Sequence, residues 1–232
     1  MSMTSPRKRV LLSWSSGKDS AWALHVLRRR DALDLDVVGL LTTFNEAFDR
    51  VAMHAVRRKL VEAQAAAVGL PLVPVRLPYP CTNEVYEDRM KAAVAEASAA
   101  GVTHMAFGDL YLADIREYRI RLLEGTGVEP LFPLWGTPDG TPDLARQMLA
   151  GGLRAVLTCV DPKQLGERFV GRQFDEALLA ELPAGVDPCG EHGEFHTFCY
   201  RCPEFRNDIP IQVGEIVQRE GFWFADLCEP EN

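Results

Sequence analysis

The first half of the chain alternates between short apolar runs and stretches with helical periodicity, and this alternation restricts the fold more than any other feature. The predicted strands are residues 9–14, 36–43, 72–77 and 103–107, and the predicted helices are residues 19–30, 54–68, 83–100 and 113–124. Repeated strand–helix order predicts parallel strands, because each helix carries the chain back across a face of the sheet. We therefore expect an α/β fold in which helices cover both faces of a parallel sheet.

The rhythm changes after Glu124, where prolines and glycines cluster. We place a domain boundary near Gly127, which divides the chain into residues 9–126 and residues 127–232. The second part contains predicted helices at 141–150 and 174–182 and predicted strands at 154–160, 195–200 and 218–225. These elements predict a smaller C-terminal α/β lobe.

The composition is ordinary for a globular protein, with 47% hydrophobic and 25% charged residues. A formal net charge of −8 argues against a broad nucleic-acid-binding surface. The N-terminal residues lack the apolar core of a signal peptide, and no apolar run reaches the ~18 residues that span a bilayer. The six cysteines are scattered, which disfavours a disulfide framework in a chain of 232 residues. We expect a cytoplasmic protein with no membrane partner.

The segment from Ser13 to Ser20 follows the first predicted strand and opens the first predicted helix. Backbone N–H groups at a helix start lack partners and the helix dipole is positive there, so this turn suits phosphate. Gly17 lets the backbone approach an anion closely, and Lys18 adds a point charge. Three serines supply hydroxyl donors, namely Ser15, Ser16 and Ser20. A helix cap with incidental serines is the simpler interpretation, but the position behind the first strand favours phosphate binding.

Asp19 has two interpretations, as a cap for the helix or as a ligand that holds Mg²⁺ against phosphate oxygens. The loop itself is not a Walker A loop, which requires the pattern G-x-x-x-x-G-K-[ST]. Other strand ends are candidates for the same site, because ligands of such sheets bind at the carboxyl ends of strands. These further loops are residues 42–49, 78–82 and 108–113.

A second segment, residues 187–198, is dense in polar side chains framed by glycines. Side chains alternate along a strand, so Glu194 and His196 would share one face and Thr197 would point to the other. Such a segment could offer a carboxylate and an imidazole to one ligand. A glycine-rich turn entering an edge strand is an equally good interpretation on composition alone.

Both segments resemble signatures of a known family. Residues 15–20 resemble the S-G-G-x-D-S loop of the PP-loop ATP pyrophosphatases, with Ser16 at the usual first glycine. That exchange is tolerable if the φ angle of Ser16 is negative. The G-E-x-G-E-F-H-T-F pattern at 190–198 resembles the second signature of the diphthine–ammonia ligase-like branch. Weaker matches occur at 41–46, 53–57, 107–110 and 131–135, so the resemblance covers roughly residues 9 to 200. The stretch 111–116 is closer to the bacterial branch.

The resemblance implies a Rossmann-like (HUP-type) nucleotide-binding domain and a C-terminal substrate-binding lobe. It implies cleavage of ATP to AMP and pyrophosphate, adenylation of an unidentified carboxylate acceptor, and attack by ammonia. It assigns to ATP the residues Ser13, Ser15, Ser16, Gly17, Lys18, Ser20, Thr42, Thr43, His54, Gly108 and Asp109. It assigns catalytic roles to Lys18, Asp19, Glu191, Glu194 and His196, with Asp19 as the Mg²⁺ ligand. Tyr111, Arg116 and Arg119 could clamp an anionic acceptor, and for the two arginines surface ion pairs are the equally good alternative.

Two other functions stay open at this level. Cys199-x-x-Cys202, with Cys189 and His192 upstream, could bind a metal in a PP-loop sulfur transferase that acts on tRNA. A true zinc ribbon has two such pairs and this chain has one, so reduced thiols are the simpler interpretation. The other function is a nucleotide sensor without catalysis, which Lys18 and Asp19 disfavour. A homodimer is compatible with the sequence.

Overall fold

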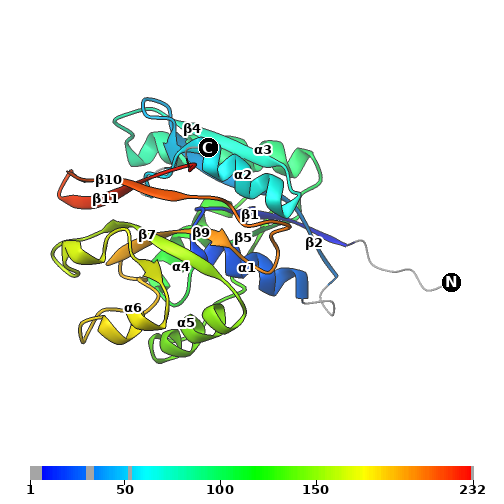
Figure 1. Ribbon diagram of the computed structural model, residues 1–232. Helices are drawn as coiled ribbons and strands as arrows, with labels where there is room; N and C mark the ends of the chain where they lie inside the picture. Colours follow the sequence, from blue (N-terminus) through cyan, green and yellow to red (C-terminus); the bar gives the residue numbers. More distant parts are fainter. Residues whose placement is uncertain (1–6, 30–33, 52–53, 231–232) are drawn as a thin grey trace.

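The computed structural model describes residues 7–29, 34–51 and 54–230, which form two sheets lying side by side (Figure 1). The strands of the first sheet are β1 (Lys8–Ser13), β2 (Leu35–Asn45), β3 (Arg50–Val51), β4 (Leu72–Leu77), β5 (His104–Ala106) and β6 (Glu129–Leu131). Its helices are α1 (Lys18–Arg29), α2 (Arg58–Val68), α3 (Asn83–Ala99) and α4 (Ala113–Leu123). The predicted end of the first helix at Arg30 lies outside the described residues.

Strands of the first sheet run in the order β3-β2-β1-β5-β6, and β4 also pairs with β2. All pairs are parallel except the short β2–β3 pair, which is antiparallel. The α/β fold with a mainly parallel sheet is therefore confirmed. The carboxyl ends of β1, β2 and β5 meet at one edge, where a doubly wound sheet binds its ligands.

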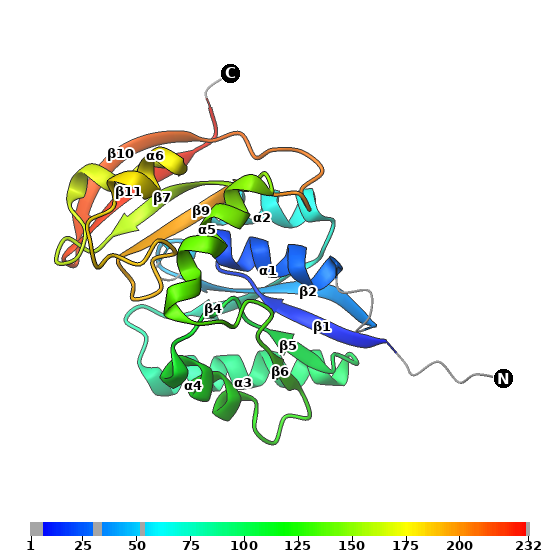
Figure 2. The ribbon, with the colours of Figure 1, turned by 90° about the horizontal axis from the view of Figure 1, so that it is seen from below.

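Alternate residues of β1 face opposite sides of the sheet. Val10 and Leu12 are fully buried in a core that includes residues of α1 and α2. Leu11 points the other way, into a second core built with Met90 of α3 and Leu122 of α4. Figure 2 shows α1 and α2 above the sheet and α3 and α4 below it. Because both faces are covered, the strands are apolar runs rather than alternating patterns.

The second sheet is antiparallel throughout. Its order is β10-β11-β7-β8, and β9 also pairs with β7. The strands are β7 (Arg154–Val160), β8 (Gln173–Phe174), β9 (Phe195–Arg201), β10 (Gln212–Arg219) and β11 (Phe222–Cys228). The helical elements of this half are η2 (Pro138–Gly140), α5 (Thr141–Ala150), η3 (Glu167–Phe169) and α6 (Glu176–Glu181). The smaller C-terminal α/β lobe is thus present.

The second sheet packs on the side of the first sheet that carries α1. Leu157 of β7 and Phe198 of β9 are fully buried in the same core as Leu24 of α1. The N–H of Cys199 in β9 donates to the carbonyl of Ser16, at 2.9 Å. This bond joins the second sheet directly to the loop before α1, and it brings the two sequence motifs together.

Two predicted elements are wrong in their limits. The helix expected from His54 begins at Arg58, because Arg57 forms an antiparallel bridge with Arg50 and its backbone is still extended. The strand expected over 218–225 is a hairpin instead. Glu220 and Gly221 form its turn with φ angles of 51° and 87°, a backbone conformation that breaks a strand.

Among the described helices, none is both long enough and apolar enough to cross a bilayer.

Candidate active site

A cavity of about 240 Å³ opens where the carboxyl ends of β1 and β5 meet the second sheet. It is lined by Ser13, Ser15, Lys18, Asp19, Ser20, His54, Phe107, Gly108, Asp109, Arg119, Cys189, Gly190, Glu191, Phe195, His196 and Thr197. Residues from both sequence motifs therefore share one cavity. Most of the residues assigned to ATP or to catalysis lie there.

Lys18, the first residue of α1, is 2% exposed, and its ammonium group is enclosed on several sides. Nζ donates to Asp19 Oδ2 at 2.9 Å and to the carbonyl of Cys189 in the second motif. The rings of Phe174 and Phe195 lie 5.6 and 5.4 Å from Nζ. Burial acts to lower the pKa of Lys18, but the neighbouring Asp19 carboxylate raises it above its ordinary value. The ammonium group is therefore charged at neutral pH and held in place.

Ser16 lies beneath the cavity and has a φ angle of 69°. The condition under which serine would be tolerable, a negative φ, is not met, because the loop turns through the left-handed region at the position where the signature has glycine. Its Oγ is buried and has no hydrogen-bond partner among the described residues. Its carbonyl accepts from Gln64 Nε2 at 3.0 Å and from the N–H of Cys199. The turn is therefore fixed from α2 and β9 at a conformational cost to Ser16.

Asp19 supplies an unpaired oxygen at the wall of the cavity. Oδ2 pairs with Lys18, while Oδ1 is buried without a hydrogen-bond partner in the described part of the chain. Burial raises the pKa of Asp19 above its ordinary value. A Cβ on Gly108 would stand 3.1 Å from the backbone of Asp19 and Ser20. Only glycine lets the β5 loop approach the first turn of α1 so closely.

Glu191 comes from the second motif and closes the cavity against the β5 loop. Its Oε1 accepts from the N–H of Leu110 at 2.8 Å and of Tyr111 at 3.4 Å. Burial raises the pKa of Glu191 to about 7 despite these two hydrogen bonds. A carboxyl group with such a pKa can give or take a proton near neutral pH.

Glu194 does not line the cavity. It is buried, and its two oxygens accept from the N–H groups of Asp187 and His192, each at 2.9 Å. It therefore holds the turn that presents Glu191. The predicted shared face of Glu194 and His196 does not apply, because β9 begins only at Phe195.

Thr197 lines the same cavity as His196, although it was not assigned to the site. The alternation of the two side chains across β9 stays a prediction. Thr197 Oγ1 accepts from the N–H of Lys18 at 3.1 Å. It therefore caps a backbone donor at the start of α1.

His54 and His196 form a ring pair at the cavity wall, with centroids 4.6 Å apart. Nδ1 of His54 lies 3.3 Å from the carbonyl of Thr197. Burial lowers the pKa of His54 to about 3 and that of His196 to about 4. Both imidazoles are neutral at pH 7, so they offer hydrogen bonds without adding charge.

Arg119 is the second cation of the cavity. Its Nε lies 3.3 Å from Asp109 Oδ2, and its guanidinium lies 5.1 Å from the centre of the Phe107 ring. Arg116 does not line the cavity and instead stacks on Phe132 and Trp135. The sequence alone did not decide whether these two arginines clamp an acceptor or form ion pairs. Arg119 lies at the cavity while already paired.

Several assigned residues lie next to the cavity but do not line it. They are Ser16, Gly17, Thr42, Thr43 and Glu194. Thr42 is buried in β2, and its hydroxyl donates to the carbonyl of Trp14 at 2.8 Å. The sequence reasoning missed Phe107, Cys189, Gly190, Phe195 and Thr197 as lining residues. The glycine-framed turn around Glu191 was the available signal for Cys189 and Gly190.

Cys199 and Cys202 lie beneath the loop rather than at the cavity. Cys199 Sγ is 3.1 Å from the carbonyl of Arg201, and Cys202 Sγ is 3.5 Å from that of Ala21. Burial raises the pKa of Cys199 well above its ordinary value. Over the described ranges, no group of three or more His, Cys, Asp or Glu side chains is arranged to hold a metal ion.

Comparison with known proteins shows the family to which the chain belongs. Residues 8–130 match the model of the diphthamide synthase N-terminal domain, and residues 141–228 match that of the C-terminal domain. The chain belongs to the diphthamide synthase family. The diphthine–ammonia ligase of Bos taurus is 30% identical over 242 residues, and that of Homo sapiens 25% over 240. In both comparisons the alignment covers 95% of this chain and 89% of the relative. The chain is therefore an enzyme of an ATP-dependent amidoligase family.

Proposed function

We propose that the enzyme binds ATP in the PP-loop cavity, transfers AMP to a carboxylate acceptor, and lets ammonia displace the AMP. The carrying observation is that Lys18 and Asp19, at the first turn of α1, share one cavity with Glu191 and the His54–His196 pair. Buried cations and a helix start suit pyrophosphate. A carboxyl group with a pKa near 7 suits proton transfer from the nucleophile.

The charges of the cavity support ATP entering together with Mg²⁺. Two cations, Lys18 and Arg119, stand beside three carboxyl groups, Asp19, Asp109 and Glu191. Without a metal ion, these carboxylates would repel a polyphosphate. Mg²⁺ binds through one or two carboxylates together with phosphate oxygens and water. The unpaired Oδ1 of Asp19 fits that requirement, and bound Mg²⁺ would neutralise phosphate charge.

The proposed reaction has two steps. An acceptor carboxylate oxygen bonds to the α-phosphorus, and the bond from that phosphorus to the bridging oxygen breaks, which releases pyrophosphate. The nitrogen of ammonia then bonds to the acyl carbon, AMP leaves, and the nitrogen loses a proton to Glu191. Lys18 stabilises the leaving pyrophosphate, because its charge is fixed before the reaction begins. The neutral imidazoles of His54 and His196 contact the acyl phosphate without competing for protons.

Product analysis by ³¹P NMR tests this proposal. With ATP, Mg²⁺, ammonium and a panel of carboxylic acids, we expect AMP and pyrophosphate in equal amounts. Lys18→Met should reduce turnover by about 10²–10³-fold, the typical loss for one preorganised donor. Lys59→Met is the matched control, since Lys59 is an exposed lysine on α2. ADP and phosphate as the products would contradict the proposed cleavage site.

A further inference from the structure

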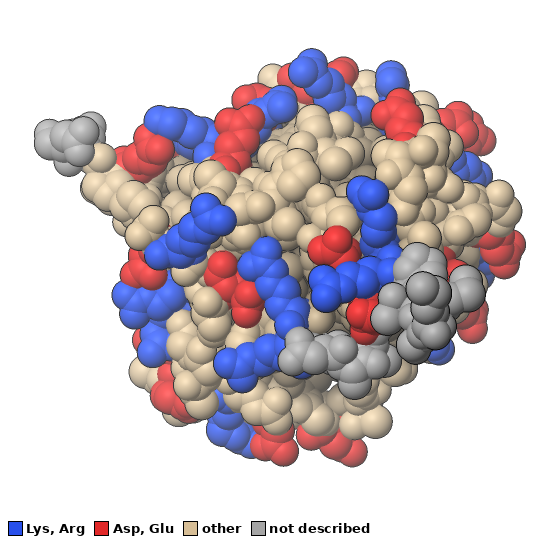
Figure 3. Space-filling model, turned by 90° about the vertical axis from the view of Figure 1, so that its right-hand side faces the viewer, with Lys and Arg blue, Asp and Glu red and all other residues tan. Residues whose placement is uncertain are grey.

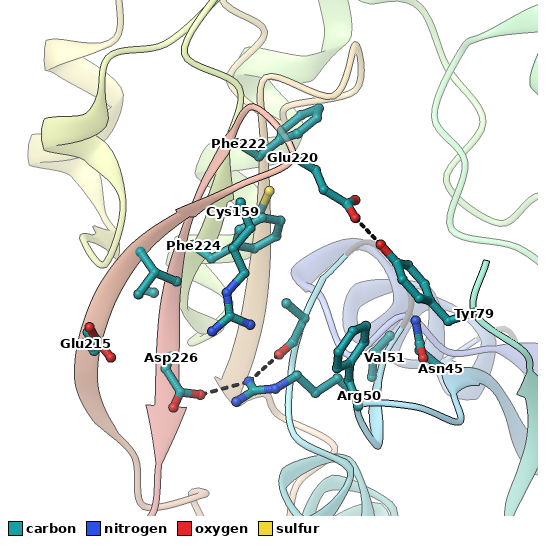
Figure 4. A pocket seen from close by; sticks show the side chains of 15 residues that line it. Asn45, Arg50, Val51, Tyr79, Cys159, Glu215, Glu220, Phe222, Phe224 and Asp226 are labelled. Carbon is teal, nitrogen blue, oxygen red and sulfur yellow. Dashed lines mark hydrogen bonds and ion pairs between the residues drawn. The ribbon is translucent and has the colours of Figure 1, made fainter. Parts of the chain in front are cut away.

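A second cavity, of about 270 Å³, lies between the β2–β3 turn of the first sheet and the β10–β11 hairpin of the second (Figure 4). It is lined by Asn45, Phe48, Arg50, Val51, Ala55, Tyr79, Cys159, Glu215, Val217, Arg219, Glu220, Phe222, Phe224, Ala225 and Asp226. None of these residues belongs to the PP-loop cavity. The second cavity has no role in the function derived above.

The two cavities adjoin across the histidine pair. His54 lines the PP-loop cavity, and the next residue, Ala55, lines the second one. His196 of β9 lines the PP-loop cavity, and Cys159, its paired residue on β7, lines the second. A molecule in the second cavity would therefore have one end next to His54 and His196. In the proposed function, that is the side from which the acceptor carboxylate approaches the α-phosphate.

The walls of the second cavity are aromatic. Phe48 and Tyr79 meet edge to face with centroids 5.1 Å apart, and Phe222 and Phe224 lie 6.4 Å apart on the hairpin. In the described part of the chain, the exposed large hydrophobic residues are Phe48 (55%), Tyr79 (51%) and Ile216 (46%). The first two line the cavity, and Ile216 stands between the lining residues Glu215 and Val217. Exposed apolar side chains that cluster at one cavity are typical of a binding site.

Four of the polar lining residues of this cavity are paired with one another. Arg50 pairs with Asp226 at 2.8 Å and also donates to the carbonyl of Ala55. The Tyr79 hydroxyl donates to Glu220, and Figure 4 shows the Arg50–Asp226 and Tyr79–Glu220 contacts as dashed lines. The innermost lining residues, Val51, Cys159 and Ala225, are apolar or weakly polar and buried. The interior therefore suits a flat apolar group better than a strongly charged one.

We propose that this second cavity holds the acceptor, and that the acceptor is a carboxylic acid that carries an aromatic ring. The ring packs among Phe48, Tyr79 and Phe224, and the carboxylate reaches past His54 and His196 to the α-phosphate. This assignment rests on the proposed function for its role in catalysis, while the binding itself does not depend on turnover.

The test measures binding without turnover. Phenylacetate, cyclohexylacetate and acetate are titrated against the protein without ATP and followed by saturation-transfer NMR. We expect phenylacetate to bind, cyclohexylacetate to bind more weakly, and acetate to show no signal. The double variant Phe48→Ala/Tyr79→Ala should weaken phenylacetate binding about tenfold or more, because two ring contacts are lost. Both side chains are exposed, so the variant should fold.

Calorimetry with ATP and Mg²⁺ completes the test. The double variant should bind ATP with unchanged affinity. The control Glu46→Ala, in the same turn but outside the cavity, should leave the affinities for ATP and for phenylacetate unchanged. A loss of ATP affinity in the double variant would assign the cavity to the nucleotide and overturn the proposal. The proposal would also be overturned if phenylacetate did not bind the natural protein, or if it bound that protein and the double variant equally well. AMP formation is not measured here, so a failure of the ATP chemistry would be seen separately.

Discussion

Ser16 carries two unfavourable features in one residue, a left-handed backbone and a buried hydroxyl that has no hydrogen-bond partner among the residues the structure describes. Each costs on the order of 1 kcal/mol, and glycine removes both while adding some unfolded-state entropy. We predict that Ser16→Gly raises the free energy of unfolding by about 1 kcal/mol, or the Tm by about 2–4 °C. Ser15→Gly should lower it, because Ser15 Oγ accepts from the N–H of Gly17. Lower stability of Ser16→Gly would contradict this interpretation.

At the residue scale, the sequence predicted which motif residues share the cavity better than it predicted the contacts between distant residues. Lys18, Asp19, Glu191 and His196 were assigned to one site from their motifs, and one cavity contains all four. Thr197 was not assigned to the site, yet it lines the cavity and accepts a hydrogen bond from the N–H of Lys18. This contact joins residues far apart in the chain, so the local sequence does not show it.

Gln64 of α2 links three elements through one buried amide. Its Oε1 accepts from Trp14 Nε1 at 2.8 Å, and its Nε2 donates to the carbonyls of Ser16 and Cys199. The link fixes the PP-loop between β1 and β9, so Gln64 is a positioning residue.

We predict that Gln64→Leu lowers the free energy of unfolding by about 2–3 kcal/mol, since buried partners lose their hydrogen bonds. It should also weaken ATP binding, measured by calorimetry. Gln147→Leu, at an exposed position on α5, serves as the control and should leave both quantities unchanged. Unaltered stability and ATP affinity in Gln64→Leu would show that the amide does not hold the loop.

At the element scale, long periodic or apolar segments were predictable and short ones were not. The strands and helices up to residue 123 were found, apart from β3, and the second predicted helix was begun four residues too early. Two residues of β3 carry no periodic signal, yet they delay the start of α2 until Arg58. The β10–β11 hairpin was missed because a turn of Glu220 and Gly221 leaves the apolar pattern around it uninterrupted.

Asp226 of β11 forms ion pairs that join the two sheets beside the second cavity. It pairs with Arg50 and Arg57, which belong to the β2–α2 connection. The hydrogen bonds from Arg57 and Arg50 lower the pKa of Asp226 from 3.8 to about 2. Because the folded pKa is depressed, the stabilisation is complete above pH 4 to 5. It is lost as the pH falls from about 4 to about 2.

We predict that Asp226→Asn lowers the free energy of unfolding at pH 7 by about 1–2 kcal/mol, a value reduced for the partial exposure of the pair. Urea unfolding at several pH values should show the difference from the natural protein shrinking between pH 4 and pH 2. Asp208→Asn removes an exposed pair with Arg201 and should cost less than about 0.5 kcal/mol. A difference that is constant with pH would contradict the ionic explanation.

At the scale of the whole molecule, the sequence predicted two α/β parts but not how they meet. The contact of β9 with the loop before α1 joins residues 199 and 16, and no local pattern encodes that separation. The second cavity lies wholly at this junction, so its aromatic walls were not recognised beforehand. On the face shown in Figure 3, acidic and basic side chains are interspersed.

The central claim is that the loop before α1 holds the β- and γ-phosphates of ATP. A crystal structure with α,β-methylene-ATP and Mg²⁺ tests it most directly, because that analogue cannot be cleaved between its α- and β-phosphates. We predict the β- and γ-phosphates against Ser15–Ser20 and Lys18 Nζ, with the α-phosphate turned toward Glu191 and His196. A γ-phosphate that points away from this loop, or an analogue bound in the second cavity, would contradict the account.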